Sequence, residues 1–419
     1  MKYDVVVIGM GMSGLVAASK AISKGKNTLL VAKGQGALSI TSGCLDFWGY
    51  CLDNPETIAP NPYEEIRQLI IRNPEHPYAK VFDILQESID FFKEIIGYSG
   101  YRLVGDITDN QHVLTSLGTV HPSAFVPASM IIKKREMIKK VIAVGFTGYG
   151  DFYPQMYLDN LEENMFPKAQ KISQIIDLEI NADLKSNSLA HLLTKDEILN
   201  SVINELRQQN ANQCDRKEYF SDEETLFVFP SVLGEQPNYN VWERLTTELS
   251  AQVIEVPGLP PSIPGQRLDK ALTIFLSHHG AEFRHNTQVI GFNAKDRKVT
   301  SIIVQDSSHS KHIIEAKSFI LATGSFWGGG LIDKKNVLYE PIFNLEVYAP
   351  NQFNDTPFFS LNGQPFLSSG IEVDNLLRPN PNLENLYSAG SILAHCNYSM
   401  EKNGLGLALA TGYKAGSNV

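Results

Sequence analysis

The opening segment of the chain constrains the fold more than any other part. Asp4–Ile8 (DVVVI) is a short β-branched run, typical of a strand buried on both faces. Gly9-Met10-Gly11-Met12-Ser13-Gly14 follows at once, and Leu15–Ser23 is small and apolar, as a helix packed closely on a sheet requires. Asn27–Ala32 then supplies a second strand. A G-x-G-x-x-G turn inside such a βαβ unit predicts a dinucleotide-type fold.

Each residue type in this turn has a physical reason. Gly9 permits the tight turn, Gly11 lets the backbone approach a pyrophosphate, and Gly14 allows the helix to lie against the strand. The helix N-terminus then presents free N–H groups and a partial positive charge to a phosphate. We therefore predict that Gly9, Gly11, Ser13 and Gly14 bind a cofactor.

The end of the second strand bears on which cofactor is bound. An Asp or Glu usually closes this strand and accepts hydrogen bonds from a ribose, but here Ala32 and Lys33 stand there and no acid follows until Asp46. Because Lys33 suits a phosphate dianion, the pattern favours FMN, with FAD as the alternative. The loop Gly34–Gly43 offers backbone and hydroxyl donors, so Ala32, Lys33, Ser42 and Gly43 are predicted cofactor contacts.

Two further signals lie near the C-terminus. His312–Glu315 and Lys317–Ala322 read as two short strands ahead of the first of them. Phe319–Gly324 (FILATG) and Leu386–Ser391 (LYSAGS) each read as a buried strand followed by a glycine turn, as in flavoproteins. Flavoproteins commonly carry an Asp after the second turn, and Ser391 stands there instead. A helix beginning near Gly404 would direct its N-terminus at a flavin pyrimidine ring. These signals add six predicted cofactor contacts, namely Thr323, Gly324, Gly390, Ser391, Gly404 and Gly406.

The middle of the chain alternates strand-like and helical segments, which predicts a parallel α/β layer. The expected strands are Lys140–Phe146, Lys171–Ile180, Thr225–Pro230 and Gln252–Pro257, and the expected helices lie near Gln155–Asn164, Lys195–Gln209 and Asn238–Ser250. The fold class is therefore α/β. We expect a Rossmann-like, discontinuous flavin-binding domain, residues 1–114 and 263–419, with an inserted parallel α/β domain, residues 115–262.

Composition narrows the class of partner. At 419 residues the chain is long enough for two domains, and a net charge of −10 argues against nucleic-acid binding. Cys44, Cys51, Cys214 and Cys396 have no spacing suited to zinc or an iron–sulfur cluster, so no metal site is expected and the thiols read as reduced and cytoplasmic. We also expect no signal peptide and no membrane span.

Several longer stretches carry a resemblance to a known family. They are DVVVIGMGMSGL, GQGALSITSGCLD, LPPSIPGQRL (Leu259–Leu268), GSFWGGGLI with EPIFNLEV (Gly324–Val347), and LRPN with NLYSAGSIL (Leu377–Leu393). On these the chain resembles the B subunits of anaerobic glycerol-3-phosphate dehydrogenases. The resemblance runs from Asp4 to the last helix and is weakest in the middle. Met400–Gly406 (MEKNGLG) departs from it by being less rich in glycine.

The resemblance implies oxidation of sn-glycerol 3-phosphate to dihydroxyacetone phosphate, with electrons passing toward quinone in fumarate or nitrate respiration. It implies FMN on this chain, and as partners an FAD-containing A subunit and a membrane-associated iron–sulfur C subunit. The chain would then be cytoplasmic and peripheral at the inner face of the cell membrane, held there through a partner.

Oxidising a secondary alcohol requires hydride transfer to flavin and a base for the hydroxyl proton. His395, after the second glycine turn, is the candidate base, and Arg267 and Arg378 are candidate grips on the substrate phosphate. Structural roles are open for all three residues. Two alternatives also stay open: a non-catalytic electron-relay and assembly subunit of the same complex, and a fumarate-reductase-like flavoenzyme.

Overall fold

The computed structural model describes residues 2–162, 165–180, 182–213, 224–335, 337–351, 357, 363–379 and 382–419. Its larger sheet is built from both ends of the chain. The neighbours in this seven-stranded sheet run β13 (Glu282–Arg284), β2 (Thr28–Val31), β1 (Lys2–Ile8), β16 (Lys311–Leu321), β15 (Lys298–Gln305) and β14 (Gln288–Lys295), and β19 (Leu386–Ser388) pairs with β16. Strands β13, β2, β1, β16 and β19 are parallel, so their carboxyl ends meet at one edge. This edge is where a doubly wound sheet binds ligands.

Strand β16 joins two parts of this sheet. Its first half pairs antiparallel with β15, and its last residues lie parallel between β1 and β19. The sequence predicted two segments here, His312–Glu315 and Lys317–Ala322, and the structure corrects them to one continuous strand. Where the two segments meet, the exposed Glu315 and Lys317 alternate with the buried Ile314 and Ala316, so the pleat continues without a break.

Four longer helices pack with this sheet and with one another: α1 (Met12–Ser23), α4 (Leu85–Gly97), α9 (Ile263–His278) and α11 (Gly404–Asn418). Helices α1 and α11 approach closely because small residues face each other. A Cβ added at Gly412 would lie 2.4 Å from the Ser13 carbonyl oxygen, and one at Gly416 would lie 2.4 Å from that of Ala17. The small, apolar sequence of α1 therefore reflects contact with the C-terminal helix as well as with the sheet.

A second sheet lies in the middle of the chain. All four of its strands are parallel, in the order β10 (Gln170–Ile176), β9 (Lys140–Phe146), β11 (Thr225–Pro230) and β12 (Gln252–Val256). Its helices are α5 (Pro154–Asn160), α6 (Ser186–Leu192), α7 (Asp196–Gln213) and α8 (Asn240–Leu249). The predicted parallel layer is confirmed, although β10 ends earlier than expected. The proposed domain bounds at residues 115 and 262 stay a prediction.

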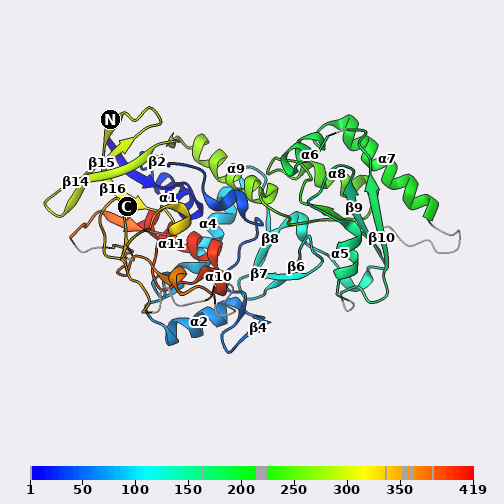
Figure 1. Ribbon diagram of the computed structural model, residues 1–419, viewed down its shortest axis with the longest axis horizontal. Coiled ribbons are helices and arrows are strands. Elements are labelled where there is room, and N and C mark those ends of the chain that lie inside the picture. The colour runs from blue at the N-terminus through cyan, green and yellow to red at the C-terminus, as the bar shows by residue number, and fades with distance from the viewer. Residues whose placement is uncertain are drawn as a thin grey trace.

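Shorter elements complete the described chain. The two-stranded pairs are β3 (Tyr50–Cys51) with β4 (Asn54–Ile58), β5 (Leu103–Gly105) with β8 (Phe125–Pro127), β6 (Gln111–Leu114) with β7 (Val120–Ser123), and β17 (Ile332–Lys334) with β18 (Val337–Tyr339). The remaining α-helices are α2 (Pro62–Arg72), α3 (Tyr78–Val81) and α10 (Tyr398–Glu401). Figure 1 shows the two sheets at opposite ends of the long axis, with α9 between them and both termini in the same half.

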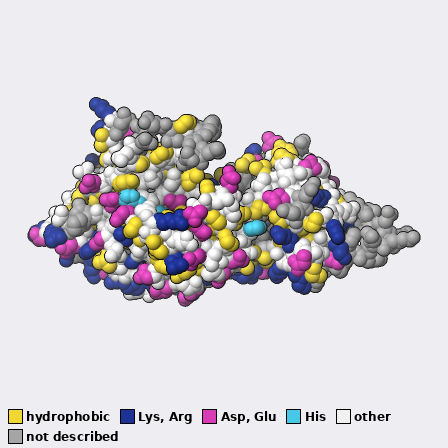
Figure 2. All heavy atoms as spheres, turned by 90° about the horizontal axis from the view of Figure 1, so that it is seen from below, with side chains coloured by type: hydrophobic (Ala, Val, Ile, Leu, Met, Phe, Trp, Pro, Cys, Tyr) yellow, Lys and Arg dark blue, Asp and Glu magenta, His cyan; other side chains and the backbone are white. Residues whose placement is uncertain are grey.

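The surface carries charges of both signs, and three of the four cysteines lie among the described residues. Figure 2 shows one face on which Lys and Arg side chains are interspersed with Asp and Glu side chains. Cys44, Cys51 and Cys396 are free thiols, and Cys214 lies outside the described residues. Within the described part of the chain, no helix is both long enough and apolar enough to cross a bilayer.

Candidate flavin site

The glycine turn after β1 has the geometry of a phosphate cradle. Gly9 has φ +113°, and a Cβ there would lie 2.1 Å from the Ala322 carbonyl oxygen, so only glycine fits. A Cβ at Gly14 would lie 2.1 Å from the Gly9 oxygen. At Gly11, by contrast, a Cβ would meet nothing within 4 Å. The fold therefore requires Gly9 and Gly14, whereas the space at Gly11 is open for a ligand.

The N-terminus of α1 is also available. Gly11 is its N-cap, and among the described residues no side chain caps the helix. The first N–H groups of a helix lack intrahelical partners and favour an anion. Ser13 does not point its hydroxyl into this space, because Ser13 Oγ donates to the Ala389 carbonyl oxygen at 3.3 Å. Backbone N–H groups, rather than the Ser13 side chain, are thus the donors that α1 offers.

The turn after β16 lies beside Gly9. The Thr323 hydroxyl is buried, and no described residue hydrogen-bonds to it. Gly324 has φ +75°, and a Cβ there would be 3.6 Å from Ser391 Oγ. An unpartnered buried hydroxyl next to the glycine turn fits a site that takes a polar group.

The predicted turn at Gly390–Ser391 packs against the turn at Gly9–Gly14. Gly390 has φ +84°, and a Cβ added there would lie 2.3 Å from Ser13 Oγ. The Gly390 N–H donates to Thr411 Oγ1 at 3.0 Å. The structure therefore brings the turns at Gly9–Gly14, Thr323–Gly324 and Gly390–Ser391 to one edge of the sheet. Parallel pairing of β1, β16 and β19 produces this convergence.

At the end of β2, Ala32 is buried and Lys33 is exposed. The Ala32 N–H donates to the Arg284 carbonyl oxygen at 3.0 Å, so the backbone of the last residue of β13 also lies at this edge. Arg284 pairs in register with Val31. No sequence motif indicated that Arg284 would lie beside Lys33, because parallel pairing of β13 with β2 joins segments far apart in the chain.

The loop after β2 lies directly on the glycine turn. A Cβ at Gly36 would be 2.5 Å from the Met10 oxygen and 2.6 Å from the Gly11 Cα. Further along, Ser42 Oγ accepts a hydrogen bond from the Cys44 N–H at 3.2 Å, and Gly43 adopts φ +77°. The loop predicted to contact the cofactor therefore lies next to the predicted phosphate cradle.

The same loop continues to the start of α11, which begins at Gly404 as predicted. The Gly406 N–H donates to the Asp46 carbonyl oxygen at 2.9 Å, and a Cβ at Gly406 would collide with this oxygen and with the Phe47 ring. One carboxylate oxygen of Asp46 is buried without a partner among the described residues, while the other lies 3.3 Å from His121 Nε2. Asp46 was not predicted as a site residue, because no sequence motif marks it.

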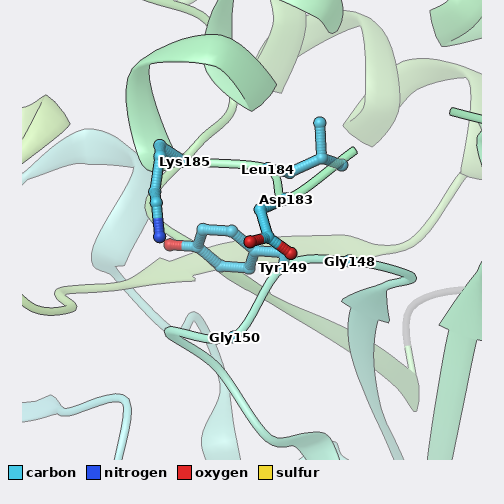
Figure 3. A pocket seen from close by; sticks show the side chains of 6 residues that line it. All are labelled: Gly148, Tyr149, Gly150, Asp183, Leu184 and Lys185. Atoms are coloured by element: carbon cyan, nitrogen blue, oxygen red, sulfur yellow. The ribbon is translucent and has the colours of Figure 1, made fainter. Parts of the chain in front are cut away.

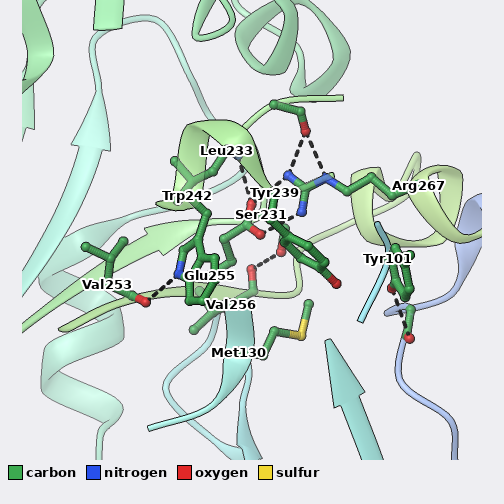
Figure 4. Close-up of polar contacts among 12 residues, drawn as sticks. Tyr101, Met130, Ser231, Leu233, Tyr239, Trp242, Val253, Glu255, Val256 and Arg267 are labelled. Atoms are coloured by element: carbon green, nitrogen blue, oxygen red, sulfur yellow. Dashed lines mark hydrogen bonds and ion pairs between the residues drawn. The ribbon is translucent and has the colours of Figure 1, made fainter. Parts of the chain in front are cut away.

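The candidate catalytic residues are engaged with protein groups. Arg267 is 1% exposed, donates twice to Glu255 at 2.7 and 2.9 Å, and donates twice to the Gly234 carbonyl oxygen at 2.9 and 2.6 Å (Figure 4). Burial alone lowers the pKa of Arg267, but the charge and hydrogen bonds of Glu255 leave this pKa above its usual value. A role for Arg267 as a phosphate grip stays a prediction.

His395 and Arg378 also have acidic partners. His395 Nε2 lies 2.8 Å from Glu372 Oε1, and the centroids of the His395 and Tyr348 rings are 4.0 Å apart. Arg378 forms an ion pair with Asp374 at 2.7 Å, which holds the pKa of Arg378 above its usual value. His395 follows the Gly390 turn closely in sequence, and its role as a base stays a prediction.

A cavity of about 360 Å³ lies apart from the candidate flavin site, in the middle part of the chain. It is lined by Gly148, Tyr149, Gly150, Asp183, Leu184 and Lys185, at the carboxyl end of β9 (Figure 3). The Leu184 N–H donates to the Gly148 carbonyl oxygen at 2.8 Å and thereby fixes one loop to the other. None of the sequence-predicted site residues lines this cavity.

Comparison with known proteins agrees with this geometry. The family described as FAD binding domain matches residues 4–407. Proteins named as the B subunit of anaerobic glycerol-3-phosphate dehydrogenase are similar over the whole length. The Vibrio vulnificus (strain CMCP6) protein is 28% identical and covers 99% of this chain and 95% of its own, and the Mannheimia succiniciproducens protein is 26% identical and covers 100% and 98%.

Solved structures resemble the chain more weakly. Mycobacterium smegmatis Sdh1 in complex with UQ1 has a TM-score of 0.42 and 12% identity, and covers 100% of this chain and 68% of its own. The Bacillus halodurans glycerol-3-phosphate dehydrogenase complexed with FAD has a TM-score of 0.25 and 9% identity, covering 78% and 35%. Likenesses this weak do not indicate a function.

The family match spans nearly the whole chain and includes every turn that forms the cradle. It supports a flavin cofactor, and FAD most directly. The resemblance noted in the sequence is confirmed by the full-length relatives. The chain therefore belongs to the FAD binding domain family, and it is a flavin-dependent oxidoreductase.

Proposed function

We propose that this chain is the flavin-containing B subunit of an anaerobic respiratory glycerol-3-phosphate dehydrogenase. Its reaction would convert sn-glycerol 3-phosphate to dihydroxyacetone phosphate and pass electrons toward quinone in fumarate or nitrate respiration. The observation that carries this proposal is the similarity to proteins of that name over 99–100% of the chain. The flavin cradle at the edge of the larger sheet supplies the redox centre that such a reaction needs.

We propose FMN as the cofactor, with FAD as the alternative. Lys33 and the backbone of Arg284 lie at the end of β2, where an acid would accept hydrogen bonds from the adenosine ribose. Ser391 stands where flavoproteins commonly carry a second acid. The flavin phosphate would bind the N–H groups at Gly11–Gly14, and its ring would lie between the loop ending at Gly43 and the start of α11.

The cofactor released from the purified, heat-denatured chain tests this proposal. We expect FMN, at about one per chain, because cationic and neutral residues replace both acidic contacts. Chromatography against FMN and FAD standards measures the outcome. Release of FAD would overturn the preference for FMN and leave the flavin site standing, while the absence of any flavin would overturn both.

The substrate would approach the flavin near His395. The carboxylate of Glu372, 2.8 Å from His395 Nε2, can orient the imidazole and stabilise it when it takes up a proton. This arrangement supports His395 as the base that removes the hydroxyl proton of the substrate. When bound, the flavin would accept the hydride.

A relay chain without a substrate site is the second candidate. It is favoured by the engagement of both candidate phosphate grips, since Arg267 bonds to Glu255 and Arg378 to Asp374. A bound phosphate would have to compete with these carboxylates. In this version another chain of the complex would carry out the hydride transfer.

Anaerobic reduction of the isolated, flavin-loaded chain by glycerol 3-phosphate separates the two candidates. We expect bleaching of the flavin absorbance and one dihydroxyacetone phosphate for each flavin reduced. A chain that dithionite reduces but glycerol 3-phosphate does not, within a complex that turns over, would contradict the catalytic version and support the relay. Glycerol without phosphate serves as the substrate control.

For the assembly, we propose an FAD-containing A subunit and a membrane-associated iron–sulfur C subunit as partners. The naming of the relatives as B subunits supports a complex of several chains. The chain would lie in the cytoplasm, at the inner face of the membrane, through its contact with such a partner.

A further inference from the structure

Side chains from distant parts of the chain meet beside the start of α11, with the Glu401 carboxylate at their centre. Glu401 Oε1 accepts from the Asn397 N–H at 3.0 Å. Glu401 Oε2 accepts from His76 Nε2 at 3.1 Å, from the Cys396 thiol at 3.1 Å and from Asn403 Nδ2 at 2.5 Å. Four donors thus saturate one carboxylate.

The histidine tautomer shows what kind of cluster this is. The Tyr78 N–H donates to His76 Nδ1 at 3.1 Å, so Nδ1 carries a lone pair and the proton of the neutral ring is on Nε2. His76, Cys396 and Glu401 have the mutual spacing of metal ligands. A metal on Nε2 would need the opposite tautomer, with a proton on Nδ1 facing the Tyr78 N–H. The cluster is therefore a hydrogen-bond network.

The protonation states fit this network. Burial raises the pKa of the Cys396 thiol well above its usual value, and the charge of Glu401 adds to this effect, so the thiol keeps its proton and donates it. Burial also raises the pKa of Glu401, but the hydrogen bonds from His76, Asn397 and Cys396 bring it below its usual value overall. Glu401 is thus a largely buried anion held by donors.

This network includes the N-cap residue of α11. Asn403 is the N-cap residue of α11, and asparagine is among the best N-cap residues, yet its side chain makes no cap hydrogen bond. In α2 of the same chain, the N-cap Asn61 does cap, with Oδ1 accepting from the Glu64 N–H at 3.0 Å. Asn403 differs in its backbone, with ψ 3° where Asn61 has ψ 94°, and in its amide, which donates to Glu401 and to Cys396 Sγ, at 3.4 Å for the latter.

We propose that Glu401 is a positioning residue that holds Asn403 away from α11, so that the first-turn N–H groups of Gly404 and Leu405 stay open to the flavin, while the Gly406 N–H is held by the Asp46 carbonyl oxygen. This inference rests on the proposed placement of the flavin ring at the start of α11. The loop that would hold the other side of the ring is fixed at the same place, because the Gly49 N–H donates to the Glu401 carbonyl oxygen at 3.1 Å and the Gly406 N–H to that of Asp46. Without the Glu401 charge, the Asn403 side chain is free to cap the helix and compete with the flavin.

The test is a rescue experiment on the full-length apo chain titrated with FMN. We expect Glu401→Gln to weaken FMN binding about fivefold, the equilibrium weight of one N-cap hydrogen bond. The double variant Glu401→Gln/Asn403→Ala should restore the affinity to within about twofold of wild type, because no side chain is left to cap α11. Glu243→Gln, on helix α8 beside the second sheet, removes one carboxylate as a matched control and should leave FMN binding unchanged.

Hydrogen exchange of the apo chain supplies a readout that does not depend on flavin. The N–H of Leu405, which an N-cap side chain can reach, should exchange more slowly in Glu401→Gln than in wild type, and return to the wild-type rate in the double variant. A double variant that binds FMN more weakly than Glu401→Gln would show a purely structural role and overturn the inference. Zinc retained at one per chain after incubation with zinc chloride, and lost in Glu401→Gln, would also overturn it. A wild-type chain that binds no flavin would instead contradict the proposed function, while the exchange rates would still test the capping.

Discussion

Replacing Arg267 by alanine is expected to lower the free energy of unfolding by about 3–5 kcal/mol. The guanidinium and the Glu255 carboxylate are both almost fully buried, and their paired hydrogen bonds join α9 to β12. Truncating Arg267 leaves the Glu255 charge and the Gly234 carbonyl oxygen buried with fewer partners. Urea unfolding followed by circular dichroism measures the change.

Two variants separate the ion pair from a general loss of side-chain volume. Arg378→Ala breaks a much more exposed pair with Asp374 and should cost less than about 1 kcal/mol. Arg267→Met combined with Glu255→Met removes both charges and should be less destabilising than Arg267→Ala, because no unpaired charge remains. If Arg267→Ala were as stable as Arg378→Ala, the buried pair would not hold these elements together.

Gly11→Val is expected to abolish most flavin binding while leaving the fold intact. Gly11 has φ −82°, which any residue adopts, and a Cβ there meets nothing in the protein. The valine side chain would instead fill the space where the phosphate approaches the N-terminus of α1. Crowding of about 1–3 kcal/mol corresponds to an affinity loss of roughly 5- to 150-fold. Flavin absorbance per chain and FMN titration measure the loss.

Neighbouring glycines provide the contrast. Gly9→Val should fail to fold, since it combines φ +113° with a Cβ 2.1 Å from the Ala322 oxygen. Gly258→Val lies on a loop, has no atom within 4 Å of its Cβ, and should retain both fold and flavin. A folded Gly11→Val chain with undiminished flavin would show that the cofactor phosphate does not bind at this turn.

The sequence predicted most of the fold because its signals are local. A β-branched run, a glycine turn and a small apolar helix specify β1 and α1 within two dozen residues, and Lys140–Phe146 and Thr225–Pro230 match their strands residue for residue. In β16, exposed charged residues interrupt the apolar run, so the sequence suggested two strands. Pairing with β15 and β1 makes them one continuous strand. The inserted sheet was predicted for the same local reason.

The sequence by itself determined that three glycine turns would follow buried strands and that the usual acids would be missing after β2 and after the last of these turns. Only the tertiary structure decided which side chains act together. Only the structure shows that Arg267 is paired with Glu255, and that Glu401 accepts a hydrogen bond from His76, 325 positions away in the chain. The physical reason is that the signals for strands, turns and helices lie in neighbouring residues. The partner of a buried charge, by contrast, can come from any segment that folding places next to it.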